Sequence, residues 1–387
     1  MTHIFLTTIS LLLLFLALSK AEDGPPTRPF RFPYLFPFSD HPVLPQGVSK
    51  NPQGQPNVPG QPNIPGQPGQ QNLPQQADPF PGLKEEFYAH SCPKAEKIVA
   101  DVLSHLVKTN PNAVANILRL QFHDCFVNGC DASVLLDFAP SGDKVEKSSM
   151  FNGLLLKGAD MMDDIKTKLE EECPEVVSCA DILAFASNAG MTMAGLPPRK
   201  PLGGRRDALI SLATMAEADN LPLPDWTLDK MLELFNKKGF SLEEMVIMMG
   251  AHSVGISHCD AFMERVYNFK NTGKPDPTLT LEVVEELRKG CPNPGTPQYR
   301  NPPVNFDETP TVLDNLFYKN MVTRRKTLLI TDSHLLEDPR TFPTVEKMAA
   351  DASLFTKRFG EVMVKLSAVE VLTGNQGEVR KTCRSTN

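Results

Sequence analysis

Hydrophobic positions recur with a helical period along the chain from about residue 83 to residue 387. Two groups follow the i, i+3, i+4 spacing of an amphipathic helix: Ile98, Val102, His105 and Leu106, then Val114, Ile117, Leu118 and Phe122. The first helix should stop before Asn110-Pro111, because the residue before a proline disfavours helical geometry. Ser178 is a predicted N-cap, and Ser241-Leu-Glu-Glu244 is a predicted capping box. Alternating strand-like runs are scarce, so the pattern predicts one mainly α domain with very little β structure.

The N-terminal residues 1–21 have a different pattern. An apolar run from Ile4 to Leu18 is followed by the small residues Ser19 and Ala21. This pattern predicts a signal peptide and a secreted, extracellular protein. A single membrane anchor is the alternative, which the short run and the lack of a basic stop-transfer flank disfavour.

Residues 22–82 are rich in proline, glutamine and glycine. Sixteen of the 35 prolines fall between Pro25 and Pro81, and QPNVPG, QPNIPG and QPGQQN follow one another with a period of six. Such a segment lacks the apolar residues for a core and is predicted to be polyproline II or disordered. It is either an inert spacer or pro-segment, or a segment that contacts a partner.

Charge and cysteine content narrow the function classes. The net charge is −7 without a long Lys/Arg run, which argues against a nucleic-acid partner or a stable anionic membrane partner. The eight cysteines are an even number, and in an exported chain they predict four disulfides. Spacing alone leaves the pairing open, and only Cys125 and Cys130 suggest a local partner.

The stretch RLQFHDCFVNGCDAS, residues 119–133, concentrates reactive side chains. Arg119 and His123 are i and i+4, so a helix projects both from one face, with Phe122 beside them. This arrangement can aim a general base and a fixed cation at one small substrate. The alternative is that His123 and Asp124 simply end a helix.

The same stretch contains candidate metal ligands. Asp124, Asp131 and Ser133, with the backbone carbonyls between them, offer the oxygens that Ca²⁺ requires. A zinc site made of His123, Cys125 and Cys130 is the alternative, but exported cysteines are more often oxidised.

A second histidine lies in MMGAHSVGISHC, residues 248–259. His252 directly follows the helix expected after Ser241, and Gly250 and Gly255 allow close backbone approach. A lone histidine at a helix end is usually a capping or core residue. Two separate histidine sites on a mainly α scaffold can instead hold a planar cofactor between them.

These motifs resemble the plant secretory (class III) haem peroxidases. The resemblance runs from FYAHSCP, at Phe87, to GEVRKTCRSTN at the C-terminus, and includes RLQFHDCFVNGCDAS, VSCADILAFAS, GGRRD, MMGAHSVG and TPTVLDN. It implies a helical fold with one haem b between distal and proximal halves, and two Ca²⁺ ions. It also implies a monomeric enzyme of the cell wall or apoplast that reduces hydrogen peroxide and oxidises phenolic donors by one-electron steps. In that setting, residues 22–82 are a candidate for contact with cell-wall polymers.

The resemblance assigns roles residue by residue. His252 matches the axial ligand of the haem iron, and Asp332 matches the carboxylate that holds its ring. His123 matches the distal base and Arg119 the charge stabiliser. The remaining matches are Asn152, which fixes the tautomer of His123, Phe122, which shapes the haem pocket, and Pro197, which lines substrate access.

The resemblance also implies the ligand sets and the disulfides. The distal calcium set is Asp124, Val127, Gly129, Asp131 and Ser133, with Glu146 nearby. The proximal calcium set is Ser253, Asp307, Thr309, Val312 and Asp314. The implied disulfides are Cys92–Cys173, Cys125–Cys130, Cys179–Cys383 and Cys259–Cys291.

The chain departs from the family pattern at several places. Arg199 stands where members generally have tryptophan, Ala261 where some have an aromatic residue, and no Asn-x-Ser/Thr sequon occurs. In NFDETPTVLD the expected aspartate three residues before Thr309 is Phe306, and Asp307 sits two before. A one-residue shift turns an extended side chain to the opposite face. Asp307 therefore serves as a ligand only if the backbone bulges or shortens there.

Two other function classes compete with an active peroxidase. One is a wall protein of the same fold with vestigial catalysis, which the intact set of Arg119, His123, Asn152, His252 and Asp332 argues against. The other is a zinc hydrolase that uses His252, His258 and Cys259, although a matching carboxylate pattern is missing.

Overall fold

The computed structural model describes residues 80–152, 156–297 and 299–387, which belong to a compact unit, Pro74–Asn387. The expected signal peptide, and the extension up to residue 79, lie outside the described residues. Within the described ranges, no helix is both long enough and apolar enough to cross a membrane.

The described residues are mainly helical, as the hydrophobic pattern predicts. Their α-helices are α1 (Ala95–Thr109), α2 (Ala113–Val127), α3 (Ala159–Glu172), α4 (Cys179–Met193), α5 (Ala213–Ala216), α6 (Leu228–Lys237), α7 (Leu242–Met248), α8 (Met263–Tyr267), α9 (Leu281–Gly290), α10 (Leu316–Arg324), α11 (Ile330–Glu337), α12 (Phe342–Ala350) and α13 (Ala352–Leu366). The short 3₁₀ helices include η1 (Ser133–Leu135), η2 (Glu146–Ser148) and η4 (Met249–Ser253). The strands are β1 (Lys84–Glu85), β2 (Leu202–Gly203), β3 (Ile256–His258) and β4 (Pro303–Asn305).

The strands form two small antiparallel pairs. β1 pairs with β2, and β3 pairs with β4 with Ile256 opposite Asn305. The prediction of a mainly α fold with very little β structure is therefore confirmed for the described residues.

Local signals in the sequence set the helix ends. The Ser178 hydroxyl accepts a hydrogen bond from the Asp181 N–H at 3.1 Å, which caps α4. Ser241 and Glu244 form the predicted capping box of α7, with bonds of 2.8 and 3.2 Å. α1 ends at Thr109, directly before Asn110-Pro111, as expected.

The buried face of α1 differs from the predicted one by one residue. Its fully buried residues are Ala95, Val99 and Leu103, whereas Ile98, Val102 and Leu106 are only partly buried. His105, which shares the face of Ile98, Val102 and Leu106, is exposed. α1 packs against both α3 and α4, so the centre of its contact face is set by two neighbours and not by its own apolar stripe.

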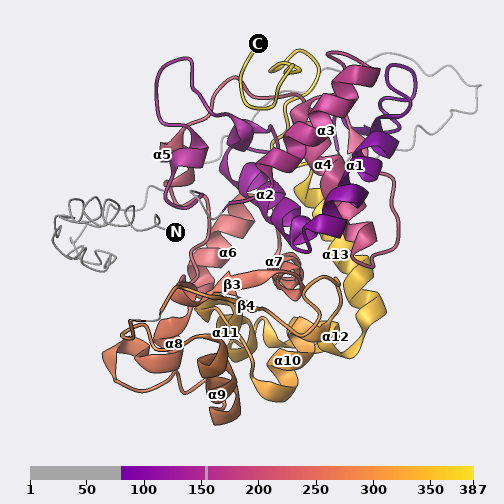
Figure 1. The fold of residues 1–387 in the computed structure, drawn as a ribbon. Coiled ribbons are helices and arrows are strands. Elements are labelled where there is room, and N and C mark those ends of the chain that lie inside the picture. Colours follow the sequence, from indigo (N-terminus) through magenta and orange to yellow (C-terminus); the bar gives the residue numbers. More distant parts are fainter. Residues whose placement is uncertain (1–79, 153–155, 298) are drawn as a thin grey trace, which may run out of the picture. The chain divides into compact units, whose positions relative to one another are not determined.

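The helices form two groups (Figure 1). In the first, α1 packs on α3 and α4, and α2 packs on α4. In the second, α10 packs on α12, and α7 packs on α12 and α13. α2 carries His123 and η4, after α7, carries His252. The two histidines therefore come from different halves of the unit.

Four disulfides cross-link the described residues: Cys92–Cys173, Cys125–Cys130, Cys179–Cys383 and Cys259–Cys291. They are the four pairs that the family resemblance implies, and they use all eight cysteines of the sequence.

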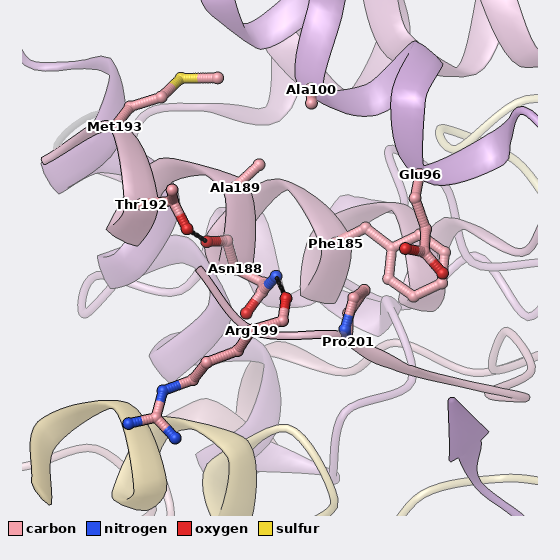
Figure 2. Close-up of a pocket in the computed structure, with 9 residues that line it drawn as sticks. All are labelled: Glu96, Ala100, Phe185, Asn188, Ala189, Thr192, Met193, Arg199 and Pro201. Carbon is pink, nitrogen blue, oxygen red and sulfur yellow. Dashed lines mark hydrogen bonds between the residues drawn. The ribbon is translucent and has the colours of Figure 1, made fainter. Parts of the chain in front are cut away.

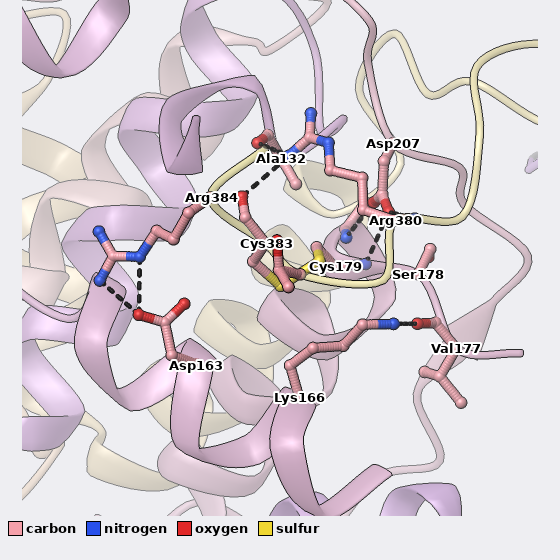
Figure 3. Close-up of a disulfide and its surroundings, with 12 residues drawn as sticks. Ala132, Asp163, Lys166, Val177, Ser178, Cys179, Asp207, Arg380, Cys383 and Arg384 are labelled. Carbon is pink, nitrogen blue, oxygen red and sulfur yellow. Dashed lines mark hydrogen bonds and ion pairs between the residues drawn. A yellow bond between two sulfur atoms is a disulfide. The ribbon is translucent and has the colours of Figure 1, made fainter. Parts of the chain in front are cut away.

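The Cys179–Cys383 disulfide fixes the C-terminal segment against the start of α4 (Figure 3). Beside it, the fully buried Arg380 donates hydrogen bonds to the carbonyl oxygens of Ala132 and Ala208 at 2.8 and 2.6 Å. The buried carboxylate of Asp207 accepts from the backbone N–H groups of Cys179, Ala180 and Arg380. The chain end is therefore part of the interior that supports the loop after α2.

Candidate functional site

The distal histidine is held by a two-step hydrogen-bond relay. His123 is only 8% exposed, and its Nδ1 lies 2.7 Å from Oδ1 of Asn152. The Asn152 Nδ2 donates to the Glu146 carbonyl at 2.9 Å, so Oδ1 is the amide atom that faces His123. Nδ1 must then carry the proton, because the amide oxygen can only accept. The Nε2 atom of His123 is left as an unprotonated acceptor.

The electrostatic surroundings keep His123 neutral. Burial, and then the positive charge of Arg119, lower the pKa of His123 to about 3. Arg119 reaches solvent, yet protein surrounds it closely enough that desolvation lowers its pKa to about 10. At neutral pH, α2 thus presents an uncharged base beside a permanent cation.

The Phe122 ring lies beside His123 on α2 and is held by other aromatic rings. Its ring stacks on Phe126 with centroids 4.1 Å apart, and both rings contact Phe235. Phe126 also stacks on Phe240. This aromatic packing limits the rotation of Phe122, which is only partly buried beside His123.

The proximal histidine is paired with a buried carboxylate. His252 Nδ1 lies 2.9 Å from Oδ1 of Asp332 in α11. The Asp332 side chain is fully buried, whereas that of His252 is 26% exposed. Because Nδ1 faces a carboxylate, Nε2 is the nitrogen that can bind a metal.

Two aromatic rings orient His252. Phe306 stacks on it with centroids 4.4 Å apart and planes 3° apart, and Phe317 meets it edge-on at 5.8 Å. From sequence alone, Phe306 is only a mismatch in the calcium segment, and its contact with His252 is not predicted. Phe306 directly follows β4, and the pairing of β4 with β3 brings it back to His252. Both strands are too short to predict from sequence.

The two halves also approach closely where Gly255, three residues after His252, meets the first turn of α2. Gly255 has a φ of +86°, and a Cβ on it would lie 2.7 Å from the Cβ of Ala115 in α2. No larger residue fits there without moving α2, which explains why glycine follows the His252 motif.

The loop after α2 contains a buried set of oxygens. Asp124, Asp131, Ser133 and Glu146 are all at most 4% exposed. Among the described residues, the Ser133 hydroxyl and both carboxylate oxygens of Glu146 are buried without a hydrogen-bond partner. Burial raises the pKa of Asp131 to about 6 and that of Glu146 to about 8. Unpaired oxygens in a buried acidic loop are what a hard cation would satisfy.

The backbone of this loop is equally constrained. Val127 and Gly129 lie inside the loop that the Cys125–Cys130 disulfide closes. Gly129 has a φ of +98°, and a Cβ there would lie 2.3 Å from the Glu370 carbonyl oxygen. In the part of the chain that the structure describes, no three His, Cys, Asp or Glu side chains converge as a metal site. A cation here therefore also needs carbonyl and hydroxyl ligands.

The second oxygen set surrounds Asp307. Its Oδ1 accepts from the N–H and the hydroxyl of Thr309 at 2.8 and 3.2 Å, and the Thr309 hydroxyl also lies 3.0 Å from Asp314. Oδ2 of Asp307 and the Ser253 hydroxyl are buried without partners in the described part of the chain. Asp307 is 1% exposed. The backbone thus turns Asp307 inward despite the one-residue shift, while the nearby Val312 side chain is exposed.

The structure does not bring Pro197 to the histidines through any interaction seen in the described residues. Pro197 is exposed after α4. The turn before it packs on the 312–313 segment, where the Leu313 N–H donates to the Ala194 carbonyl at 2.8 Å.

Arg199 lies between α4 and α13. It borders a pocket of about 240 Å³ between α1 and α4, whose lining includes Glu96 and Phe185 but neither histidine (Figure 2). The Arg199 side chain extends to α13, where its Nη2 donates to the Lys357 carbonyl at 2.9 Å. A Cβ at position 360 would lie 2.5 Å from Nε of Arg199, so Gly360 makes room for the arginine.

Both zinc alternatives are wrong. Cys125 and Cys130 are joined to each other, and Cys259 is joined to Cys291. A disulfide sulfur is not a thiolate ligand, so neither cysteine set is available to zinc.

Comparison with known proteins gives a consistent result. A model of the peroxidase family matches residues 99–351. "Peroxidase 36" of Arabidopsis thaliana is 39% identical over 306 residues, covering 79% of this chain and 88% of the relative. "Peroxidase 28" of the same plant is 38% identical over 305 residues, with 79% and 93% covered. "Peroxidase C2" of Armoracia rusticana is 39% identical over 310 residues, with 79% and 88% covered.

Proposed function

We propose that this chain, which belongs to the plant secretory (class III) haem peroxidases, oxidises phenolic donors by one-electron steps with haem b held by His252. Membership makes the chain an oxidoreductase that acts on hydrogen peroxide. The observation that carries the proposal is the pair of oriented histidines, His252 on Asp332 and His123 on Asn152, on opposite halves of the fold.

The residues present fit a haem. His252 has one ring nitrogen committed to a carboxylate and the other available to a metal, and its ring plane is fixed by Phe306. When bound, haem supplies the iron at which peroxide is reduced and electrons are exchanged. Asp332 stays buried beside His252 and accepts from its ring, which raises the basicity of the ligand nitrogen.

The residues on the distal side, around His123, carry out the proton transfer. Nε2 of His123 accepts a proton from hydrogen peroxide and returns it to the departing oxygen as water leaves. General acid–base transfer of this kind contributes about 10²–10⁴-fold in rate. The guanidinium of Arg119 stabilises the negative charge on the departing oxygen, an effect worth about 10²–10³-fold for one well-placed donor. Asn152 keeps the proton of His123 on Nδ1, so that Nε2 faces the substrate as a base.

The two oxygen sets would hold calcium. The distal ion would use Asp124, Val127, Gly129, Asp131 and Ser133, with Glu146 behind them. The proximal ion would use Ser253, Asp307, Thr309, Val312 and Asp314. The unpaired buried oxygens of Ser133, Glu146, Ser253 and Asp307, as seen among the described residues, support both assignments.

Metal analysis should find two calcium ions per chain. A chelator should remove the proximal ion first, because Asp307 already uses one oxygen to accept from Thr309. Its loss should disturb His252 through the adjacent Ser253, which the absorption spectrum of the bound haem would report. A single calcium per haem, at the distal loop, would show that the shortened segment has lost the proximal site.

Secretion, a monomeric state and contact of residues 22–82 with cell-wall polymers complete the proposal. They are supported by the family membership and by the composition of the N-terminal residues. The substitution at Arg199 supports a donor surface that differs from that of relatives with tryptophan there.

An absorption spectrum combined with steady-state turnover tests the function. The purified chain should show a haem Soret band that changes on adding hydrogen peroxide, followed by oxidation of a panel of phenols. A Soret band without turnover would instead favour a structural wall protein with vestigial catalysis. A chain that cannot take up haem would refute the assignment of His252.

A further inference from the structure

Three consecutive residues of the shortened calcium segment have three different partners. Phe306 stacks on His252, and the buried Asp307 faces Thr309. Glu308 instead bonds to side chains of α10 and of the residues just after it, and its own side chain is 48% exposed. Three neighbouring side chains of one short segment are therefore attached to three different parts of the fold.

Glu308 is held by three donors. Its Oε2 accepts from Asn320 Nδ2 at 2.7 Å, and its Oε1 accepts from Arg324 Nη1 at 3.0 Å and Lys326 Nζ at 2.9 Å. Lys326 is only 6% exposed and is itself fixed by Glu286 at 2.9 Å. An isolated surface ion pair does little to fix the position of its side chains. A carboxylate that accepts hydrogen bonds from three fixed donors has one preferred position.

The ends of the segment are also fixed. The Phe306 N–H donates to the Gly255 carbonyl at 3.3 Å, and the Gly255 N–H donates to the Pro310 carbonyl at 2.8 Å. Gly255 lies three residues after His252. Only residues 307–309 lie between these two attachment points, so a rotation at Glu308 must be absorbed by its immediate neighbours.

We infer that Glu308 is a positioning residue: its anchoring to Asn320, Arg324 and Lys326 holds Asp307 toward the proximal calcium ligands and Phe306 against His252. It supplies the constraint that lets the segment work with one residue fewer than the family pattern. The inference rests on the proposed function, because it concerns the proposed calcium ion and the proposed haem ligand.

The test compares three variants of the full, haem-loaded protein: Glu308→Ala, Glu308→Gln and Glu282→Gln. Glu282 belongs to the same network, but it is 81% exposed and lies 3.4 Å from Arg324. Glu308→Gln and Glu282→Gln remove the same charge, so they are matched. The measurements are calcium per chain, the rate of calcium release to a chelator, and the absorption and magnetic circular dichroism bands that report histidine ligation.

Glu308→Ala should release the second calcium about tenfold faster than wild type and should shift the ligation bands, since hydrogen bonds to a charged group are lost. Glu308→Gln keeps an acceptor oxygen and should lie between Glu308→Ala and wild type. Glu282→Gln should match wild type in every measurement.

The outcomes separate this inference from the proposed function. A wild-type protein with one calcium would refute the proximal site, and with it this role of Glu308. If wild type binds two ions and Glu308→Ala releases the second at the wild-type rate, the inference alone fails. Equal effects of Glu282→Gln and Glu308→Gln would also refute it, because the effect would then come from network charge and not from the segment.

Discussion

Replacing His123 with leucine should slow the reaction with hydrogen peroxide by about 10²–10⁴-fold while leaving haem binding intact, because the variant removes the distal base. The His123 side chain is buried, and leucine has a similar volume, so the fold should persist. Stopped-flow absorption after mixing with peroxide measures the rate. His105→Leu is the matched control, because His105 is exposed on α1. Wild-type speed in His123→Leu would contradict the distal assignment.

The pH profile gives an independent view of the same group. The pKa of His123 is lowered to about 3, so His123 is unprotonated above that pH and available as a base. The wild-type rate constant should therefore stay level from neutral pH into the acid range and fall only near that pKa. Asn152→Asp places a negative charge beside the ring, which favours the protonated form. Its acid limb should move up by about 1–3 pH units.

Replacing His252 with alanine should abolish tight haem binding or give a spectrum without histidine ligation. Within the described residues, Asp332 is the hydrogen-bond partner of His252, and the variant leaves that buried carboxylate without its imidazole. His258→Ala, in β3 six residues later, is the matched control and should bind haem normally. Haem titration followed by the Soret band distinguishes the two. Unchanged spectrum and turnover in His252→Ala would remove His252 from the site.

Local chemistry explains which parts of the fold the sequence could predict. The N-caps at Ser178 and Ser241 act on N–H groups three residues away, so the sequence alone locates them. The inner face of α1 could not be predicted as well, because α3 and α4 decide which residues are buried. The disulfide pairs came from the family resemblance, since spacing leaves them undetermined.

In the site, too, local patterns could be predicted from the sequence, whereas contacts between distant segments could not. Arg119 and His123 share a helix face, and the i, i+4 spacing is sufficient to place them together. The stacking of Phe306 on His252 depends on a three-residue strand pair and on a turn around Asp307. Asp307 needs a local change of backbone to serve as a ligand, and whether this change occurs cannot be predicted from the sequence. The backbone path of this segment is set by the hydrogen bonds of Gly255 with Phe306 and Pro310.

The attachment of the chain end has a consequence for biosynthesis. Cys179 is 204 residues away from its partner Cys383, and Arg380 bonds to the carbonyl of Ala132, next to a proposed calcium ligand. At about 5–20 residues per second of synthesis, α4 waits on the order of 10–40 s before Cys383 is made. The distal loop therefore cannot reach its final form before Arg380 and Cys383 have been synthesised. Oxidation of this disulfide and capture of the distal ion are therefore expected to be late steps in folding, and a chain truncated before Arg380 should fail to fold stably.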